Sequence, residues 1–381
     1  MSASFFRFRA APFLLLLCVL PVAAPLAAPA PAWGGPATTW TNNDDMLLFY
    51  EALVRIQEQS LQEDAPREMV RKAIQGYLHQ IDDFSDYLSP EEYAAWRAAR
   101  QGGYAGVGMD IFADRTGRVL CLPYPGSPAY GAGIRYGDEL TFVGRDAVQG
   151  VPVRVVGSWI RGRSGESVSL VVKKFDGSVQ SLSLVRRDME LKELAVERDG
   201  PWPRIRLFSF GADTAKRLRK ALASLPAGTP RVIDLRGNTG GDLFAAIDAA
   251  ALFLPQGATV VDIRSRAGIK RYSVETDPMD RAPLVLWQDG LTASAAEVFI
   301  AALVENHRGK SVGQTTFGKG VTQTVSELSD GSALFLTNGA LRTPNGQYYH
   351  RSGLKPDREL NLAPGASPEA LWPATLELLG K

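Results

Sequence analysis

The chain has 381 residues, of which 45% are hydrophobic and 22% charged, a balance typical of a globular protein with two or three domains. Its formal net charge is +1 and it has no block of Lys and Arg, which argues against a nucleic-acid partner because phosphate backbones require a concentrated basic face. The three histidines, His79, His307 and His350, are widely spaced, so neither a metal site nor a Ser/His/Asp triad is expected.

Residues 1–32 have the order of a secretory signal. Arg7 and Arg9 precede an apolar stretch, and small residues and prolines follow it. Cleavage after Ala32 would satisfy the small-x-small rule. The apolar stretch is short for a bilayer span and is broken by Pro21, although an uncleaved N-terminus would associate the protein with a membrane. We therefore expect an exported protein, in the periplasm or cell envelope of a bacterium.

Residues 33–101 are expected to form a helical N-terminal region. Apolar residues recur at steps of three and four over 44–61 and 66–81, which predicts two amphipathic helices that pack together. Ser89, followed by Pro90 and two glutamates, is a typical N-cap and predicts a third helix that ends near Arg100.

Short β-like runs separated by glycines fill residues 102–188 and predict a small, mostly β module. The alternative is that these strands belong to a larger sheet. Against it, PGSPAYGAGIRYGDELTFVG (125–144) resembles the part of PDZ domains in which a turn and a short helix lead into a strand. Upstream, four residues resemble the PDZ loop whose backbone donors bind the terminal carboxylate of a peptide. These residues are Gly106, Val107, Gly108 and Met109.

Strands and helices alternate over residues 189–362, which predicts an α/β core with buried strands. Asp213 stands where it could cap one of these helices. The last segment, 363–381, is expected to end in a short helix. The whole chain is therefore expected to be a multidomain protein of mixed α/β class.

A glycine-rich turn, DLRGNTGGDLF, lies between a strand and a helix of this core. Such a turn can direct backbone N–H groups at an anion, although its glycines could merely let the chain turn. It lacks the Gly-Lys-Ser/Thr ending of a P-loop and the spacing of a dinucleotide fingerprint. An oxyanion hole therefore fits the pattern better than a nucleotide site.

Ser294, in LTASAAEVFIAAL, has two interpretations. With Glu297 three residues later it forms a capping box, in which the serine is only a helix cap. Alternatively, a serine at the positive end of a helix can be a nucleophile. Lys319 lies between two glycines in TTFGKGVTQTV, with Gln323 four residues on, and by itself would be read as a solvated surface lysine.

Together these stretches resemble the carboxyl-terminal processing peptidases, serine peptidases with a Ser/Lys dyad and an embedded PDZ domain. The resemblance covers nearly all of the chain after the expected signal. The motifs that carry it, in chain order, are FSDYLSPEEY, DLRGNTGG, TASAAE, TFGKGVTQTV, LSDGSALFLT and SGLKPD. It implies a crotonase/ClpP-like α/β fold for the peptidase core.

The resemblance also implies roles for individual residues. Ser294 would be the nucleophile, Lys319 the general base and Gln323 the residue that positions the lysine. Lys319 follows Ser294 by 25 residues and Gln323 follows Lys319 by four, as in the family. A free lysine has a pKa of about 10.4, so Lys319 could act as a base only in a dry pocket.

Two backbone N–H groups would form the oxyanion hole. The resemblance implies those of Ala295 and Gly240, with Gly241 as the alternative to Gly240. The chain departs from many relatives at Ala296, where they have serine. This departure affects local hydrogen bonding and not the nucleophile.

We therefore expect an exported serine endopeptidase that recognises apolar C-terminal tails of protein substrates through its PDZ domain, which can gate the active site. No metal or organic cofactor is required. The alternative is a non-catalytic peptide-binding scaffold on the same fold. A hydratase or acyl-CoA enzyme is a weaker third interpretation, since it explains neither the PDZ-like segment nor the signal. The sequence gives no indication of the oligomeric state.

Overall fold

The computed structural model describes residues 43–61, 63–101, 105–114, 116–124, 126–188, 193–363 and 366–380. The expected signal, residues 1–32, lies outside the described residues, as does the last residue. None of the helices within the described ranges is both long and apolar enough to span a bilayer.

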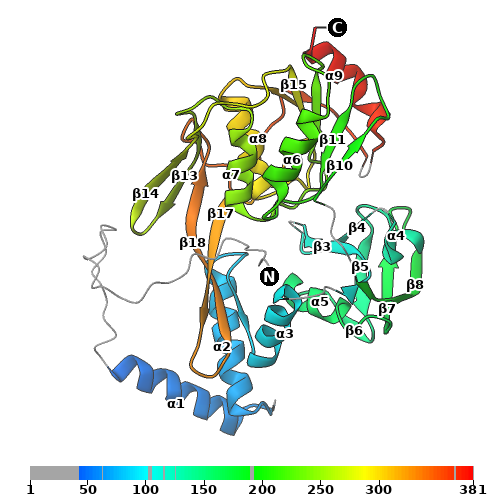
Figure 1. Cartoon of the computed structure of the whole chain (residues 1–381). Helices are drawn as coiled ribbons and strands as arrows, with labels where there is room; N and C mark the ends of the chain where they lie inside the picture. Colours follow the sequence, from blue (N-terminus) through cyan, green and yellow to red (C-terminus); the bar gives the residue numbers. More distant parts are fainter. Residues whose placement is uncertain are drawn as a thin grey trace, which may run out of the picture.

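The N-terminal region forms three helices and one short strand (Figure 1). They are α1 (Asn43–Gln59), α2 (Pro66–Ile81), β1 (Asp86–Leu88) and α3 (Pro90–Gln101). Ser89 caps α3 as expected: its Oγ accepts the N–H of Glu92, and Glu92 accepts the N–H of Ser89.

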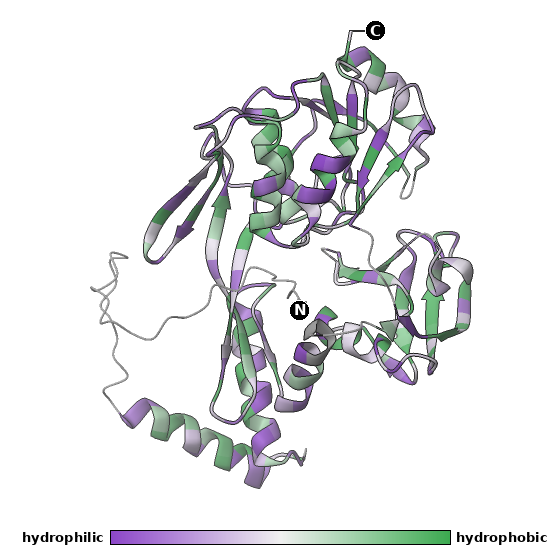
Figure 2. Cartoon of the chain, viewed as in Figure 1, coloured by the Kyte–Doolittle hydropathy of each residue, from purple (hydrophilic) through white to green (hydrophobic). Residues whose placement is uncertain are grey.

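The first two helices contact each other as expected, but the contact is limited and α1 buries none of its residues. The helix extends away from the rest of the chain, and its apolar side chains are exposed (Figures 1 and 2). An amphipathic period therefore located the helix correctly, but did not show what its apolar face contacts. The exposed residues are Met46, Leu47, Leu48, Phe49, Tyr50 and Ile56.

A five-stranded antiparallel sheet connects this region to the core. Strand β1 pairs with β18, so that Asp86 lies opposite Phe335, while β13 pairs with the other half of β18 and β17 with its opposite edge. The N-terminal region is thus joined to the core by backbone hydrogen bonds. The remaining strands are β13 (Thr259–Ser265), β14 (Gly268–Ser273), β17 (Val321–Glu327) and β18 (Ala333–Arg342).

The core is built on a six-stranded sheet of order β10-β11-β12-β15-β16-β19, parallel except for β10. Its strands are β10 (Leu194–Glu197), β11 (Arg204–Leu207), β12 (Arg231–Asp234), β15 (Leu284–Gln288), β16 (Lys310–Gly313) and β19 (Arg358–Glu359). The helices that follow or flank these strands are α6 (Thr214–Ala223), α7 (Leu243–Ala251), α8 (Ala295–Glu305) and α9 (Trp372–Leu378), with a 3-10 turn at Pro368–Ala370.

Both faces of this sheet are buried, which explains why its strands read as continuous apolar runs. Ile233 and Leu286 belong to a core cluster with residues of α6, α7 and α8, whereas Val232 and Val285 belong to a second cluster with residues of α9. Asp213 stands before α6 but its side chain does not cap the helix; the hydroxyl of Thr214 instead accepts the N–H of Gly211.

The described residues between 105 and 188 form a six-stranded sheet and a two-stranded one with a core of their own, called here the β module. Strands β2 and β9 pair antiparallel, so the chain enters and leaves the β module side by side. The module therefore is an insertion between α3 and β10. Its elements are β2 (Ala105–Gly106), β3 (Met109–Ala113), β4 (Val119–Pro123), α4 (Pro128–Gly131), β5 (Glu139–Val143), β6 (Asp146–Ala147), α5 (Val153–Ile160), β7 (Ser167–Lys173), β8 (Val179–Val185) and β9 (Arg187–Asp188).

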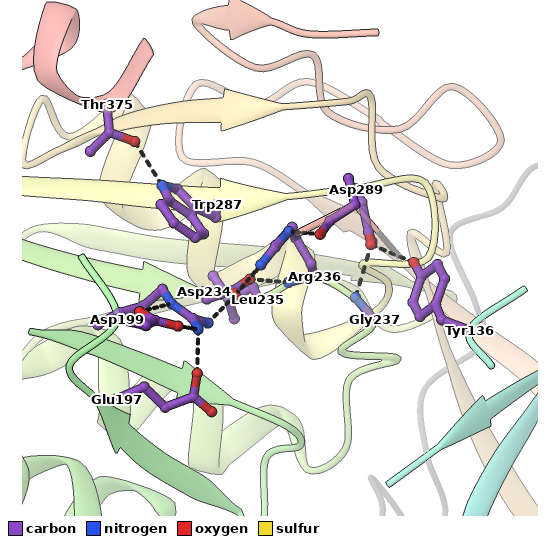
Figure 3. A network of polar contacts seen from close by, with 12 residues as sticks. Tyr136, Glu197, Asp199, Asp234, Leu235, Arg236, Gly237, Trp287, Asp289 and Thr375 are labelled. Carbon is purple, nitrogen blue, oxygen red and sulfur yellow. Dashed lines mark hydrogen bonds and ion pairs between the residues drawn. The ribbon is translucent and has the colours of Figure 1, made fainter. Parts of the chain in front are cut away.

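Charged side chains are buried in the core sheet and form one network (Figure 3). The Asp234 carboxylate, at the end of β12, accepts hydrogen bonds from Arg204 Nη1 at 2.6 Å and from Arg236 Nη2 at 2.7 Å. Burial would raise the pKa of Asp234, but the hydrogen bond and charge of Arg236 and the charges of neighbouring arginines hold it below its usual value. Both guanidinium groups lie over the ring of Trp287, whose indole N–H donates to Thr375 of α9 at 2.9 Å.

Asp234→Ala should lower the free energy of unfolding by about 3–5 kcal/mol, because it leaves two buried cations without their shared partner. Urea denaturation of the whole chain measures this. Arg55→Ala, which removes an exposed ion pair with Glu51 on α1, should change the free energy by about 0.5 kcal/mol or less. Equal losses for the two variants would contradict the assignment of a structural role to the network.

Candidate functional site

The three sequence motifs meet at one edge of the core sheet. The glycine loop (Gly237–Gly241) follows β12, Ser294 follows β15, and Lys319 follows β16. These strands are neighbours and parallel, so the segments that follow them lie together at their carboxyl ends, where α/β sheets commonly place ligands.

Ser294 directly precedes α8 in a strained backbone conformation, with φ 57° and ψ −121°. A left-handed conformation at a non-glycine residue costs about 1–3 kcal/mol and is typical of functional sites. Ser294 is also close to the glycine loop: a Cβ added at Gly240 would lie 2.8 Å from Ser294 Cβ. The preceding N–H, of Ala293, donates to Asn238 O at 2.9 Å.

Glu297 is fully buried and connects the serine to the lysine. Its Oε2 accepts the N–H of Ser294 and the N–H of Lys319, both at 2.8 Å. Its Oε1 accepts the hydroxyl of Thr316 at 2.5 Å and the N–H of Gly318 at 2.7 Å. Burial raises the pKa of Glu297 to about 7, although these four donors oppose the shift.

Glu297 therefore accepts the N–H of Ser294, as a capping box predicts, but it also binds the backbone of the Lys319 loop. The sequence assigned Glu297 only to the first turn of its helix, since the other segment that it contacts, the Lys319 loop, comes about 20 residues later in the chain.

The glycines beside Lys319 permit a close approach of the chain's C-terminal part. A Cβ at Gly318 would lie 2.7 Å from Gly353 N, and one at Gly320 would lie 2.9 Å from His350 N. Gly318 also has φ 90°, which a side chain would strain. The two glycines thus hold the Lys319 loop against residues 350–353.

Lys319 and Gln323 both contact Phe84, from the loop between α2 and β1. Lys319 Nζ lies 5.2 Å from the centroid of the Phe84 ring, and Gln323 Nε2 donates to Phe84 O at 2.6 Å. Gln323 Oε1 accepts a hydrogen bond from Arg154 Nη2, on α5 of the β module, at 2.9 Å. Lys319 and Gln323 therefore both lie beside Phe84, one on its ring and the other on its carbonyl, a residue that the sequence analysis did not single out.

Phe84 and Arg154 were missed because no local pattern marks them. Gln323 is 239 residues from Phe84 and 169 residues from Arg154 in the chain. Arg154 is half-buried: its guanidinium lies over the Phe335 ring, and loss of solvation lowers its pKa, although the charge of Asp86 opposes the shift.

The backbone donors expected for an oxyanion hole lie close together. A Cβ at Gly240 would lie 3.0 Å from Ala295 N. The Gly240 N–H donates to Asn238 Oδ1 at 2.9 Å, whereas the N–H groups of Gly241 and Ala295 find no acceptor in the described part of the chain. The structure therefore brings the three residues together and leaves two of their donors available.

The β module contacts the core beside these loops at two further points. The rings of Phe112, on β3, and Phe317, two residues before Lys319, pack edge to face at 4.4 Å between centroids. The hydroxyl of Tyr136 donates to Asp289 Oδ2, next to the glycine loop (Figure 3).

The four residues expected to bind a carboxylate form the turn from β2 into β3. All are buried, and Gly108 has φ 70°. As far as the structure describes the chain, the N–H groups of Val107 and Gly108 donate to no acceptor. Buried donors without a partner are costly, and this turn is therefore suited to an anionic ligand. The four residues are Gly106, Val107, Gly108 and Met109.

No group of three or more His, Cys, Asp and Glu side chains among the described residues could hold a metal ion. Cys121 is buried inside the β module, and burial raises the pKa of its thiol, which makes it a poor nucleophile. Ser294 and Lys319 are therefore the candidate catalytic side chains.

Comparison with known proteins places these motifs in a family. Residues 204–360 match peptidase family S41. The chain is 31% identical to the carboxy-terminal processing protease CtpA of Bacillus subtilis, over 86% of this chain and 72% of that protein. It is 33% identical to a carboxyl-terminal-processing protease of a Picosynechococcus species, over 82% of this chain and 80% of that protein.

The fold agrees with this similarity. The solved structure of the photosystem II D1 C-terminal processing protease matches with a TM-score of 0.69 and 27% identity, covering 86% of this chain and 96% of that one. Family match, relatives and fold all agree with the motifs around Ser294 and Lys319. The chain therefore belongs to peptidase family S41 and is a serine protease of the carboxyl-terminal processing type.

Proposed function

We propose that Ser294 and Lys319 form the catalytic dyad of an endopeptidase. Ser294 Oγ attacks a peptide carbonyl while Lys319 takes its proton and returns it to the leaving amine, and water then hydrolyses the acyl-enzyme. The strained backbone of Ser294 supports the assignment, because such strain persists where it serves a function.

The observation that carries the proposal is the position of Glu297. A single carboxylate oxygen accepts the backbone N–H of both Ser294 and Lys319, so the two residues flank one atom despite their separation in sequence. A helix cap alone would not require contacts to the lysine loop. Glu297 acts as a positioning residue, and does not itself touch the substrate.

The oxyanion of the tetrahedral intermediate would be bound by the N–H of Ala295 and by a donor of the glycine loop. Gly241 has an unused N–H, while Gly240 must first give up its bond to Asn238. We therefore keep Gly240 and Gly241 as alternatives for the second donor. Each oxyanion donor is worth about a hundred- to a thousandfold in turnover.

We further propose that the β module is a PDZ-type domain that binds the C-terminal tail of the substrate. The unpartnered donors of Val107 and Gly108 support this, since they suit a terminal carboxylate. Arg154 supports control of the active site by the module. It connects α5 of the module to Gln323, and both Gln323 and Lys319 contact Phe84. A movement of the module would therefore change the surroundings of the general base, Lys319.

We also propose export to the periplasm or cell envelope of a bacterium, on the signal-like order of residues 1–32. Substrates would be proteins with apolar tails. A non-catalytic peptide-binding scaffold is the second candidate, and a serine-directed phosphonate separates the two: only an enzyme with an activated Ser294 is labelled in a manner that depends on Lys319.

Ser294→Ala and Lys319→Ala should each lower cleavage of a protein with an apolar C-terminal tail by about a thousandfold or more. Cleavage is followed by gel electrophoresis, and phosphonate labelling by mass spectrometry. Ser273→Ala and Lys310→Ala, at exposed positions of β14 and β16, are matched controls that should keep wild-type rates. Full activity of Ser294→Ala would exclude the proposed mechanism.

Arg154→Ala should lower cleavage of the tailed protein by about tenfold to a hundredfold, since small misplacements of catalytic groups have effects of this size. It should also remove the rate difference between tailed and untailed versions of one substrate. Arg163→Ala, at an exposed position of the same module, should change neither rate. Retention of the rate difference in Arg154→Ala would show that gating does not pass through this contact.

Glu297 should make the protein less stable as the pH rises from about 4.5 to about 7. Its folded pKa is raised above the unfolded value, so its contribution is fully present below pH 4.5 and is lost on the way to pH 7. Urea denaturation should show that the wild type has a higher free energy of unfolding than Glu297→Gln at low pH. This difference should shrink by on the order of 3 kcal/mol across the range.

The exposed Glu275→Gln serves as the control for the pH series and should show no such trend relative to wild type. If the free energy of unfolding of the wild type, relative to that of Glu297→Gln, increased with pH, the raised pKa of Glu297 would be contradicted.

A further inference from the structure

One phenol of the β module reaches the glycine loop and the segment that leads into Ser294. Tyr136, between α4 and β5, donates its hydroxyl to Asp289 Oδ2 (Figure 3). Its ring also lies against the glycine loop: a Cβ added at Gly237 would come within 2.8 Å of Tyr136 Cε2. The contact is therefore both a hydrogen bond and a close packing of the ring on backbone.

Asp289 holds two segments of the site together. The residue follows β15 and is 7% exposed. Its Oδ1 accepts the N–H of Gly237 at 3.1 Å, and also the N–H groups of Leu291 at 3.1 Å and Thr292 at 3.0 Å. A single carboxylate thus joins the beginning of the glycine loop to the chain that leads into Ser294.

Thr292 extends this connection. Its Oγ1 donates to Leu235 O at 2.9 Å, just before the glycine loop, and its carbonyl accepts the N–H of Phe317 at 3.0 Å. The Asp289 carboxylate is therefore attached to all three segments that carry candidate catalytic groups, directly or through Thr292.

The tyrosine hydroxyl donates to Oδ2 of this nearly buried carboxylate, and backbone N–H groups donate to its Oδ1. Burial, and then the charge of Asp289, raises the pKa of Tyr136 well above its usual value of 10, so the hydroxyl stays a neutral donor. Without it, one buried carboxylate oxygen would lose its partner, which favours rotation of the carboxylate away from the glycine loop.

We propose that Tyr136 is a positioning residue for the proteolytic reaction, which fixes Asp289 and thereby holds the glycine loop against Ser294 and Ala295 in the geometry of the oxyanion hole. The inference rests on the proposed Ser294 mechanism. It assigns the β module a role in transition-state binding, separate from tail binding and from the Arg154 contact. Full stabilisation of the oxyanion then requires that the β module contacts the core through Tyr136.

Tyr136→Phe tests the proposal, because it removes only the hydroxyl and keeps the ring against Gly237. In the full-length protein we expect kcat on an untailed substrate, and the rate of phosphonate labelling of Ser294, to fall by about tenfold, less than loss of a whole oxyanion donor. KM should stay within about twofold, since the phenol does not touch the tail-binding turn.

Tyr124→Phe is the matched control. It removes a hydroxyl from the same module, but that hydroxyl donates to Asp110 of the module at 2.5 Å. It should leave kcat and the labelling rate at wild-type values.

Hydrogen exchange of backbone amides provides a readout independent of catalysis. The amides of Gly237, Leu291 and Thr292, which donate to Asp289, should exchange faster in Tyr136→Phe than in Tyr124→Phe or wild type. Unchanged exchange there, or wild-type kcat and labelling in Tyr136→Phe, would overturn the proposal. A raised KM with unchanged kcat would overturn it too, by placing the hydroxyl in substrate binding.

Failure of this proposal and failure of the proposed function remain distinguishable. If wild type is neither labelled nor active, the dyad mechanism fails, and amide exchange then decides alone whether Tyr136 holds the loops. If wild type is labelled and Tyr136→Phe is labelled equally fast, the dyad stands and the role of Tyr136 is rejected.

Discussion

A buried carboxylate with four donors is the constraint on which the arrangement of this protease depends. Glu297 lies in the first turn of the helix after Ser294, yet two of its four hydrogen bonds come from the backbone of the Lys319 loop. Burial makes each missing partner expensive, so the serine, the glutamate and the lysine loop can only be placed as a unit. The glycines beside Lys319 add a second constraint, since they let the same loop pack closely against residues 350–353.

The β module contacts the core at several points near that unit. Arg154 reaches Gln323, and the edge-to-face pair of Phe112 and Phe317 lies beside the lysine loop. Tyr136 reaches the carboxylate that joins the glycine loop to the serine segment. A module that contacts both the lysine loop and the glycine loop is well placed to change the geometry of both in one movement.

Much of this could be read from the sequence, and the limits have physical causes. Local patterns located Ser294, Lys319, the glycine loop and most helices, because caps, glycine turns and apolar periods depend on neighbouring residues. Phe84, Arg154 and Asp289 carried no such pattern, since their importance arises from contacts between distant segments. The period of α1 was correct but did not predict how little of the helix is buried, because periodicity identifies an apolar face without identifying what that face contacts.

Several residues that pack against the site and the core sheet come late in the chain, which matters while the chain is being synthesised. The Lys319 loop packs against residues 350–353, and Trp287 in the centre of the core sheet donates to Thr375 in the last helix. The outer strand of the sheet, β19, is likewise made after every catalytic motif. A nascent chain therefore holds all the proposed catalytic groups before the segments that arrange them have been made.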